Sequence, residues 1–508
     1  DAVGFYGCSH ATNEEDYLIQ KIARIFGTNN IEHQARKCHA STVGALAPSF
    51  GRGAMTNHWV DIKNAKCVFI IGSNIVENHP VGFQWVTEAR EKNEAKIIVA
   101  DPRYTKTANM SDIYMQHRPG TDIALINGIC KEIIENKWYD EIYLMNRTNT
   151  PFLLNNEGKL IEIKISALPE NKKLKIRSGS DNDKTIKIKI TGKDENGKDI
   201  PFEEISLDGK NFVLSKNKFS FVSKIENEKA SGEVEILDEQ DKEISKIPAG
   251  VKVYGDCYGA YAGVWTAEEM RTNKDTIFSK LVENVSSYTP EEVEKITGVE
   301  KETIKQTAEI FAKNKPVTIL YSMGTTQHTT GVQYIRSYVV LQLLLGNIGI
   351  PGGGINAMRG ISNVQGATDM GLCHILPAYL GVPQKDQKLG AYWSSFGKAR
   401  LGKFRQNEIF NILTDNFPED KFSGHKGGKG TGLWGINYEQ LPKGKGYSSQ
   451  VMLRKAKDGA VKALVIFGEN PMVSSPNLNI VKEAFKNLEL LVVVDIFESE
   501  SAAAERNE

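Results

Sequence analysis

Hydrophobic and polar positions divide the chain into three regions. Residues 1–150 and 251–508 alternate short apolar runs with segments whose apolar residues recur at helical spacing. Strands that alternate with helices are typical of an α/β fold with a parallel sheet. In residues 151–250, apolar and polar residues instead alternate one by one, for example over 160–166 and 185–191. This period of two predicts strands with one buried face.

The region 151–250 also differs from the rest in composition. It holds 18 Lys and Arg and 19 Asp and Glu, and it lacks Cys, His, Met, Trp and Tyr. Turn-forming residues separate its apolar stretches, as in Asp194-Glu-Asn-Gly197 and Asp208-Gly209. We interpret this region as a β-rich insertion without catalytic residue types. A disordered, highly charged linker is the alternative.

A pattern that occurs twice is the most informative feature of the flanking regions. One apolar run ends in Gly72-Ser-Asn74, and a second run further along ends in Asp101. The same order returns at Gly468-Glu-Asn470 and Asp495, at a similar spacing. A glycine after a strand lets the backbone approach a ligand, and a carboxylate after the next strand suits a ribose or a guanine edge. The repeat predicts two related nucleotide sites, although many α/β folds repeat this pattern for structural reasons alone.

Charge and cysteine usage argue against several other classes of protein. The 508 residues carry 63 Lys and Arg and 63 Asp and Glu, and this zero net charge argues against broad nucleic-acid binding. Neither copy of the repeat contains Gly-x-Gly-x-x-Gly, which disfavours an ordinary NAD site. The six cysteines are scattered, without a Cys-x-x-Cys pair or the density of a disulfide framework. No apolar run reaches the ~18 residues that a membrane-spanning helix needs.

One candidate for chemistry is the cysteine in Ala35-Arg-Lys-Cys-His-Ala-Ser-Thr-Val43. Two cations precede Cys38 and His39 follows it. Nearby positive charge lowers the pKa of a thiol and favours the thiolate, which binds soft metals. The alternative is that Cys38 is an ordinary loop cysteine and that His39 makes a structural hydrogen bond.

Two further segments contain glycine and polar residues. Residues 346–366 hold seven glycines around Arg359, which predicts an irregular segment that offers backbone N–H groups to a large polar ligand. The planar guanidinium of Arg359 suits a small carboxylate, and a solvated arginine in a connecting loop is the alternative. Residues 321–331 follow an apolar run and predict a strand end that opens into a helix, where N–H groups bind anions. A capped helix without a ligand explains that segment equally well.

Taken together, these segments resemble one known family. The chain is similar to the catalytic (alpha) subunit of molybdenum- or tungsten-dependent formate dehydrogenases, in the bis-molybdopterin guanine dinucleotide (dimethyl sulfoxide reductase) family, and looks closest to the respiratory, exported branch. The resemblance covers roughly residues 1–145 and 255–500. The motifs that carry it are Ala35-Arg-Lys-Cys-His-Ala-Ser-Thr-Val43, Ala47-Pro-Ser-Phe-Gly-Arg-Gly-Ala-Met-Thr-Asn-His-Trp-Val60, Gly72-Ser-Asn74, Glu77-Asn-His-Pro-Val-Gly82, Asp101-Pro-Arg-Tyr-Thr-Lys-Thr107, Met323-Gly-Thr-Thr-Gln-His-Thr-Thr-Gly331 and residues 346–366.

The resemblance implies a fold and roles for single residues. The expected fold is α/β, with two related Rossmann-like parallel-sheet domains around a pterin cofactor cleft and the β-rich insertion at 151–250. Cys38 matches the cysteine or selenocysteine that ligates the metal, His39 the neighbouring histidine that tunes or relays the proton, and Arg359 the arginine that anchors formate. The residues expected to contact the two nucleotide arms are Gly72, Asn74, Glu77, His79, Asp101, Arg103, Gly120 and Asp122 on one side, and Met323, Gly324, Gln327, Gly468, Asn470, Pro471 and Asp495 elsewhere.

The expected domain boundaries follow from the same resemblance. One α/β domain would comprise residues 1–37 and 360–508 and carry the Gly468-Glu-Asn470 site. The other would comprise residues 38–150 and 251–359 and carry Cys38 and the Gly72-Ser-Asn74 site.

The implied reaction is oxidation of formate to CO2, with two electrons passed to a molybdenum or tungsten centre held by bis-molybdopterin guanine dinucleotide. Periplasmic nitrate reductases carry Met where His39 follows Cys38, so this position favours formate. Another oxidoreductase on the same cofactor, such as a nitrate reductase, and an inactive truncated scaffold stay open as alternatives. A plain NAD dehydrogenase is a distant further reading. The sequence does not distinguish molybdenum from tungsten.

Two parts of the family are missing from the sequence, which begins at Asp1. These are the N-terminal cysteine motif for a [4Fe–4S] cluster and the C-terminal β-barrel domain. We therefore expect the metal- and formate-binding middle of a larger subunit. The implied partners are an iron–sulfur electron-transfer subunit and a membrane cytochrome b subunit of anaerobic respiratory electron transport, with no nucleic acid and no membrane span in the chain itself. The implied location is the periplasm, at the membrane through partner subunits.

Overall fold

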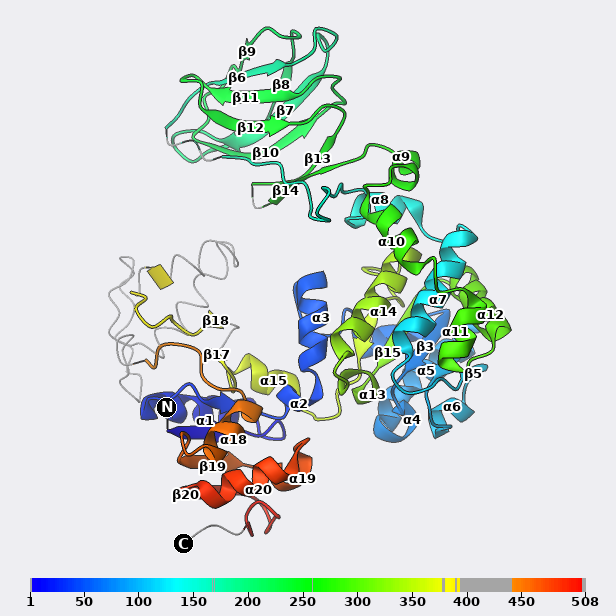
Figure 1. Cartoon of the computed structure of the whole chain (residues 1–508), viewed down its shortest axis with the longest axis vertical. Coiled ribbons are helices and arrows are strands. Elements are labelled where there is room, and N and C mark those ends of the chain that lie inside the picture. The colour runs from blue at the N-terminus through cyan, green and yellow to red at the C-terminus, as the bar shows by residue number, and fades with distance from the viewer. Residues whose placement is uncertain are drawn as a thin grey trace. The chain divides into compact units, whose positions relative to one another are not determined.

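The computed structural model describes residues 2–166, 168, 170–257, 259–376, 380–388, 391–392 and 441–504 (Figure 1). The chain divides into two compact units. Unit 1 comprises Asp1–Ala54, Tyr321–Ile335 and Ala357–Glu508, and unit 2 comprises Met55–Leu320 and Arg336–Asn356.

Unit 1 is an α/β unit. Its elements are β1 (Val3–Tyr6), α1 (Asn13–Phe26), β2 (Ile31–Glu32), α2 (Ala35–Cys38), α3 (Ala40–Phe50), α13 (Met323–Thr326), the start of α14 (Gly331–Leu345), the end of β16 (Ile355–Ala357), α15 (Val364–Asp369), β17 (Ile375–Leu376), β18 (Leu380–Gly381), α18 (Ser449–Lys457), β19 (Ala463–Phe467), α19 (Pro471–Ser474), α20 (Leu478–Asn487) and β20 (Leu490–Val494).

The core of unit 1 is a parallel sheet with the strand order β2-β1-β19-β20. Successive side chains of its strands point to opposite faces. Tyr6 and Leu464 therefore pack with residues of α18 and α20, whereas Phe5 packs with Ile19 and Ala23 of α1. Because helices pack on both faces of β1, its residues are apolar on both sides. The edge strand β20 is apolar as well, but one of its faces is exposed, at Leu490, Val492 and Val494.

Unit 2 combines a second α/β sheet with the predicted insertion. Its elements are η1 (Trp59–Asn64), β3 (Cys67–Ile71), α4 (Ile75–Asn78), α5 (Pro80–Asn93), β4 (Lys96–Ala100), α6 (Lys106–Asn109), β5 (Ile113–Met115), α7 (Asp122–Glu135), α8 (Glu141–Arg147), β6 (Leu174–Ser178), β7 (Lys187–Lys193), β8 (Asp199–Ser206), β9 (Val213–Leu214), β10 (Phe221–Asn227), β11 (Val234–Asp238), β12 (Glu243–Ile247), β13 (Lys252–Asp256), β14 (Gly259–Gly263), α9 (Ala267–Thr272), α10 (Ile277–Val285), α11 (Pro290–Thr297), α12 (Lys301–Lys313) and β15 (Val317–Tyr321), with most of α14 and β16.

The α/β sheet of unit 2 has the strand order β16-β15-β3-β4-β5, in which β3, β4 and β5 pair in parallel. Every residue of β3 is buried, and Phe69 lies against Phe311 of α12 with ring centroids 5.2 Å apart. A strand that is buried on both faces is expected inside a parallel sheet. The α/β class with parallel sheets is therefore confirmed.

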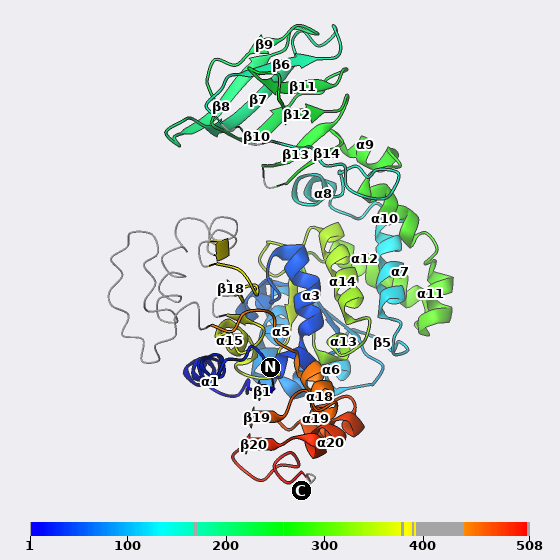
Figure 2. The ribbon, with the colours of Figure 1, turned by 60° about the vertical axis from the view of Figure 1, so that its left-hand side comes forward.

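The insertion is a folded β structure, which excludes the disordered linker as its explanation (Figure 2). Its strands form antiparallel sheets of order β10-β7-β8 and β12-β11-β6-β9. The antiparallel hairpin β13-β14 follows just beyond the predicted end of the insertion at residue 250. The alternating stretch at 185–191 corresponds to β7. The stretch at 160–166 forms no named strand and makes only isolated bridges, through Leu160 and Glu162.

Two features of the structure differ from the expectations. The compact units place Cys38 in unit 1, with Gly468, whereas the predicted boundaries grouped it with Gly72. The reason is that the helix that begins after Cys38, α3, packs against α13 of unit 1. The glycine-rich segment 346–366 is also less irregular than expected, because it contains β16 and the start of α15.

Among the described residues, no helix has the length and apolar character that crossing a membrane requires.

Candidate active site and nucleotide loops

Cys38 is the last residue of the short helix α2, and its backbone is held by the turn that follows β15. Thr326 Oγ1 donates a hydrogen bond of 2.6 Å to the carbonyl oxygen of Cys38. Gln327 Nε2 donates one of 2.9 Å to the carbonyl oxygen of Lys37. The last carbonyls of a helix lack partners within the helix, so these two bonds fix the end of α2. Ser41 Oγ adds a third bond between the two segments by donating to the carbonyl oxygen of Thr326 at 2.7 Å.

The Cys38 thiol is buried, with 7% of its surface exposed. Burial raises its pKa to about 11, and the positive charge of Arg359 opposes this shift. The expectation that the two preceding cations lower this pKa is wrong. Arg36 pairs instead with Glu32 at 2.7 Å, and the Lys37 ammonium lies 3.9 Å from Glu469. The thiol therefore holds its proton at neutral pH, and a metal that binds it has to displace that proton.

His39 belongs to a buried series of polar contacts between side chains. Its Nδ1 lies 3.4 Å from Thr42 Oγ1, which lies 3.1 Å from the Tyr321 hydroxyl. Burial raises the pKa of Tyr321 well above its usual value, so the phenol stays protonated. Arg359 acts against that shift as well. The hydroxyl group of Thr42 thus links His39 to the hydroxyl group of Tyr321, the last residue of β15.

Arg359 is half-buried and follows a backbone segment that is bonded to the end of β15. Met358 N donates to the carbonyl oxygen of Tyr321 at 2.7 Å, and Ser322 Oγ donates to the carbonyl oxygen of Met358 at 2.8 Å. The guanidinium is oriented by a 2.5 Å bond from Nη2 to the carbonyl oxygen of Gly53. The structure thus places the three predicted catalytic residues in one compact unit, with Arg359 close enough to influence the Cys38 thiol electrostatically.

The first Gly-x-Asn loop lies in unit 2, after β3. Gly72 has a φ of +59°, a conformation that favours glycine, and its N–H donates to the carbonyl oxygen of Ala100 at 3.2 Å. Ala100 is the last residue of β4, so Asp101 follows at the same edge of the sheet. Asp101 Oδ1 accepts a 2.9 Å bond from the N–H of Arg103, which is exposed. The predicted glycine and carboxylate therefore meet at the carboxyl ends of neighbouring parallel strands.

The second loop, in unit 1 after β19, repeats this geometry. Gly468 has a φ of +55°, and its N–H donates to the carbonyl oxygen of Val494 at 2.9 Å. Asp495 follows Val494, the last residue of β20, and accepts a 2.8 Å bond from the N–H of Ile496. A Cβ at Gly468 would lie 2.8 Å from Cys8 Sγ, so the loop requires glycine on grounds of space as well.

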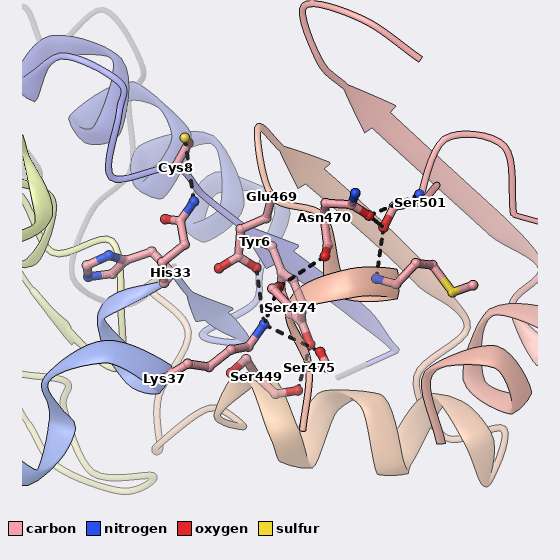
Figure 3. A network of polar contacts seen from close by, with 12 residues as sticks. Tyr6, Cys8, His33, Lys37, Ser449, Glu469, Asn470, Ser474, Ser475 and Ser501 are labelled. Atoms are coloured by element: carbon pink, nitrogen blue, oxygen red, sulfur yellow. Dashed lines mark hydrogen bonds and ion pairs between the residues drawn. The ribbon is translucent and has the colours of Figure 1, made fainter. Parts of the chain in front are cut away.

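The middle residue of the second loop, Glu469, is a buried carboxylate that the sequence argument did not select (Figure 3). Only the Lys37 ammonium approaches it as an ion-pair partner among the described residues, at 3.9 Å, and Lys37 also reaches Ser474 Oγ and Ser475 Oγ at 3.4 and 3.5 Å. Burial raises the pKa of Glu469 to about 7, and Lys37 opposes the shift. The pair connects the residue before Cys38 to the second loop.

The remaining predicted residues lie at helix starts and turns. Gly120 has a φ of +90° and precedes α7, whose first residue, Asp122, is buried and lies 3.6 Å from His117 Nε2. His79 stacks on Trp59, with ring centroids 5.4 Å apart. Met323 and Gly324 are exposed and begin α13, as the strand-to-helix pattern predicts. Asn74 precedes α4, which contains Glu77. Asn470 precedes α19, which begins with Pro471. Their roles in cofactor binding stay predictions.

Sequence reasoning missed the residues that act through contacts between distant segments. Thr326 binds the Cys38 backbone, and Lys37 pairs with Glu469. His33 lies between Ser9 Oγ, at 2.8 Å, and Thr368 Oγ1, at 3.0 Å. Burial, helped by Arg36 and Arg359, lowers the pKa of His33 to about 3. Thr326, Lys37 and Glu469 lie inside quoted motifs, which could have drawn attention to them, whereas His33 lies in none.

Comparison with known proteins assigns the chain to a family. A family model described as molybdopterin oxidoreductase matches residues 1–505. The chain belongs to the molybdopterin oxidoreductase family. It is 33% identical over 517 residues to the major subunit of the nitrate-inducible formate dehydrogenase of Escherichia coli K12. The alignment covers 100% of this chain and 43% of that protein.

Other relatives in the molybdopterin oxidoreductase family are formate dehydrogenase subunits as well. The alpha subunit of formate dehydrogenase 2 (cytochrome c-553) of Nitratidesulfovibrio vulgaris is 34% identical, over 99% of this chain and 43% of that protein. The alpha subunit of F420-dependent formate dehydrogenase 1 of Methanococcus maripaludis is 30% identical, over 99% of this chain and 49% of that protein. The chain thus spans less than half the length of these relatives.

A solved structure supports the fold. Acetylene hydratase from Pelobacter acetylenicus aligns with a TM-score of 0.51 and 16% identity, over 99% of this chain and 48% of that chain. At this identity the likeness concerns the fold alone.

The residues of the site fit a pterin-bound metal. The described residues contain no group of three or more His, Cys, Asp or Glu that could hold a metal ion. A bis-pterin cofactor brings four sulfur ligands, so a single thiolate such as that of Cys38 is a sufficient protein ligand. Gly72 and Gly468, with positive φ angles beside strand-end carboxylates, are suited to close approach of a nucleotide. The family implies a molybdopterin cofactor with molybdenum or tungsten.

Proposed function

We propose that this chain forms the catalytic core of a formate dehydrogenase that oxidises formate to CO2. The observation that carries the proposal is the Cys38–His39 pair in one compact unit with Arg359, whose charge acts on the Cys38 thiol. Identities of 33% and 34% with formate dehydrogenase subunits over nearly the whole chain support it. The balanced reaction converts formate into CO2, one proton and two electrons.

Each of the three residues has a separate task in this proposal. Cys38 is the protein ligand of the metal. Arg359 binds the substrate carboxylate through parallel N–H donors, and the bond to Gly53 limits the rotation of the guanidinium. His39 accepts the proton that the reaction releases, and its link to Thr42 and Tyr321 holds the ring in place. The chemistry that the pterin-bound metal supplies when present is the acceptance of two electrons.

The wider assembly is part of the same proposal. Because the chain spans less than half the length of these relatives, we infer that it works within a longer subunit. The [4Fe–4S] cluster of that subunit rests on the family resemblance. These relatives are subunits, which supports a partner subunit, and the role of that partner as an iron–sulfur electron-transfer subunit rests on the family resemblance. A membrane cytochrome b subunit and a periplasmic location rest on the resemblance to the respiratory branch.

Two measurements on the purified chain, made in an anaerobic host that synthesises the cofactor, test the proposal. We expect about one molybdenum or tungsten atom per chain and formate-dependent reduction of a viologen dye. Cys38→Ala should abolish both. Metal with activity on nitrate but none on formate would identify a different oxidoreductase, and a metal-free chain would contradict the catalytic role for the chain as it stands.

A further inference from the structure

Thr107 holds the first Gly-x-Asn loop in place through two hydrogen bonds of its hydroxyl group, and we call this arrangement a clasp. Its side chain is completely buried at the start of α6, after the strand end that carries Asp101. Thr107 Oγ1 donates a 2.9 Å hydrogen bond to Asn74 Oδ1 and accepts a 3.1 Å bond from the N–H of Val76. One hydroxyl group therefore ties the asparagine side chain to the backbone of the helix that follows it.

Ser501 clasps the second loop in the same way (Figure 3). It is also completely buried, and Ser501 Oγ donates a 2.7 Å hydrogen bond to Asn470 Oδ1. The same oxygen accepts a 3.1 Å bond from the N–H of Met472. The N–H of Ser501 adds a 3.2 Å bond to Asn470 Oδ1.

The two clasps share the bonds that their hydroxyl groups make, while the backbone bond from Ser501 to Asn470 is found in the second loop alone among the contacts of the described residues. Thr107 follows Asp101 at the same spacing at which Ser501 follows Asp495, and each hydroxyl bonds the N–H two residues after its asparagine. The spacing alone would be weak evidence, because the surrounding sequences differ. The shared hydrogen-bond pattern shows that the repeat extends to the side chains that support each loop.

The clasps also decide which atoms each asparagine presents. A hydroxyl has one proton, and since it donates that proton to Oδ1, the amide nitrogen must point the other way. Asn74 Nδ2 donates to Glu77, and Asn470 Nδ2 donates to Glu500 at 2.5 Å. Both acceptors are exposed carboxylates. In each loop an amide donor and a carboxylate therefore lie on the exposed side, and in the first loop the Glu77 carboxylate also pairs with Lys106 at 3.0 Å.

We propose that Thr107 and Ser501 are matched positioning residues that orient Asn74 and Asn470 for the two guanine nucleotide arms of the cofactor. This inference rests on the cofactor part of the proposed function. Neither hydroxyl has to touch the nucleotide. Each acts by fixing the asparagine amide, because loss of the hydroxyl removes the bond that holds Oδ1 in place. In Thr107→Val this bond to Asn74 Oδ1 is lost, whereas in Ser501→Ala the longer 3.2 Å bond from the N–H of Ser501 to Asn470 Oδ1 is kept.

Variants of the clasps in the whole chain test this role. Thr107→Val and Ser501→Ala remove each hydroxyl, whereas Thr107→Ser and Ser501→Thr keep it. The first readout is guanine nucleotide released by acid from the purified chain, per mole of chain. We expect Thr107→Val and Ser501→Ala each to lower the retained nucleotide about five- to tenfold, the effect of one orienting hydrogen bond, and the conservative variants to restore it. Ser111→Ala, which removes an unrelated hydroxyl near Thr107, should change nothing.

The second readout is amide hydrogen exchange of the chain, which needs no activity. Thr107→Val should speed exchange in the peptide that contains Val76 and leave the peptide with Met472 unchanged, and Ser501→Ala should do the reverse. Unchanged nucleotide content in both variants, or a wild-type chain without guanine nucleotide, would overturn the proposal. A nucleotide-loaded chain that is inactive on formate would overturn only the proposed reaction.

Discussion

The Lys37 ammonium lies 3.9 Å from Glu469 Oε2, and both groups are removed from solvent, with 12% and 2% of their side chains exposed. Lys37 directly precedes Cys38, and Glu469 is the middle residue of the second Gly-x-Asn loop. A buried charge is costly unless a partner compensates it. The pair therefore couples the position of α2 to that of a loop more than four hundred residues away in the sequence.

Lys37→Met should destabilise the chain because it leaves the Glu469 carboxylate buried without its counter-ion. We expect the free energy of unfolding at pH 8 to fall by about 3–5 kcal/mol. Urea denaturation of the metal-free chain measures this effect. Glu469→Gln in the Lys37→Met background should recover part of the loss, since the amide carries no charge. A double-mutant cycle without coupling would show that the two side chains act independently.

The raised pKa of Glu469 predicts a defined pH dependence of stability. The folded state binds this proton more tightly than the unfolded state, whose Glu pKa is near 4.5. The contribution of Glu469 is therefore fully present below pH 4.5 and is lost as pH rises toward and through about 7. Glu469→Gln should remove this part of the slope between pH 4.5 and 7. An identical slope in the variant would refute the assignment.

Thr326→Val should loosen the backbone of Cys38. Valine has nearly the same shape as threonine but leaves the Cys38 carbonyl oxygen without its 2.6 Å donor. The expected loss is about 1–3 kcal/mol in the free energy of unfolding, together with a lower metal content per chain. Elemental analysis and denaturation measure the two effects. Thr326→Ser keeps the hydroxyl and should behave like the wild type.

Arg359→Lys should weaken formate binding and leave the metal in place. Lysine keeps the positive charge but replaces two parallel N–H donors by a point charge. If the guanidinium anchors the carboxylate, KM for formate should rise about 10- to 100-fold, with unchanged molybdenum or tungsten content. Arg454→Lys, at an exposed position of α18, is the matched control. A KM equal to that of the wild type would remove Arg359 from the substrate site.

The insertion should respond to a change at Asp183 without any effect on the site. Asp183 is buried and accepts bonds from Ser178 Oγ, from the N–H and Oγ of Ser231, and from the N–H of Gly232, at 2.5 to 2.9 Å. Burial acts to raise its pKa, but these bonds outweigh burial and lower it. Its stabilisation is therefore present above pH 3.8 and is lost in stronger acid.

Asp183→Asn should lower the stability of the insertion by about 1–3 kcal/mol, because the amide accepts fewer of these bonds. Faster proteolysis and amide exchange within β6 and β11 would report this loss. Asp181→Asn, at an exposed position that pairs with Lys210, is the control and should have little effect. Reduced metal content in Asp183→Asn would contradict the separation of insertion and site.

The sequence by itself determined the features that depend on neighbouring residues in the chain. The apolar runs of β3 and β19, and the glycines that end them, are local signals, because a buried parallel strand needs continuous apolar residues and a positive φ favours glycine. The alternation over residues 185–191 predicted β7, because a strand with one buried face places apolar and polar residues in turn. The quoted motifs, taken together, indicated the family.

Tertiary structure decided what depends on contacts between distant segments. The cations next to Cys38 predicted a lowered thiol pKa, but burial raises this pKa. Arg36 and Lys37 do not offset the effect of burial, because they pair with the carboxylates of Glu32 and Glu469. The Thr326 bond to Cys38 and the Ser501 clasp on Asn470 likewise join residues that no local pattern relates. Desolvation and hydrogen-bond geometry are properties of the folded chain, and a one-dimensional pattern does not contain them.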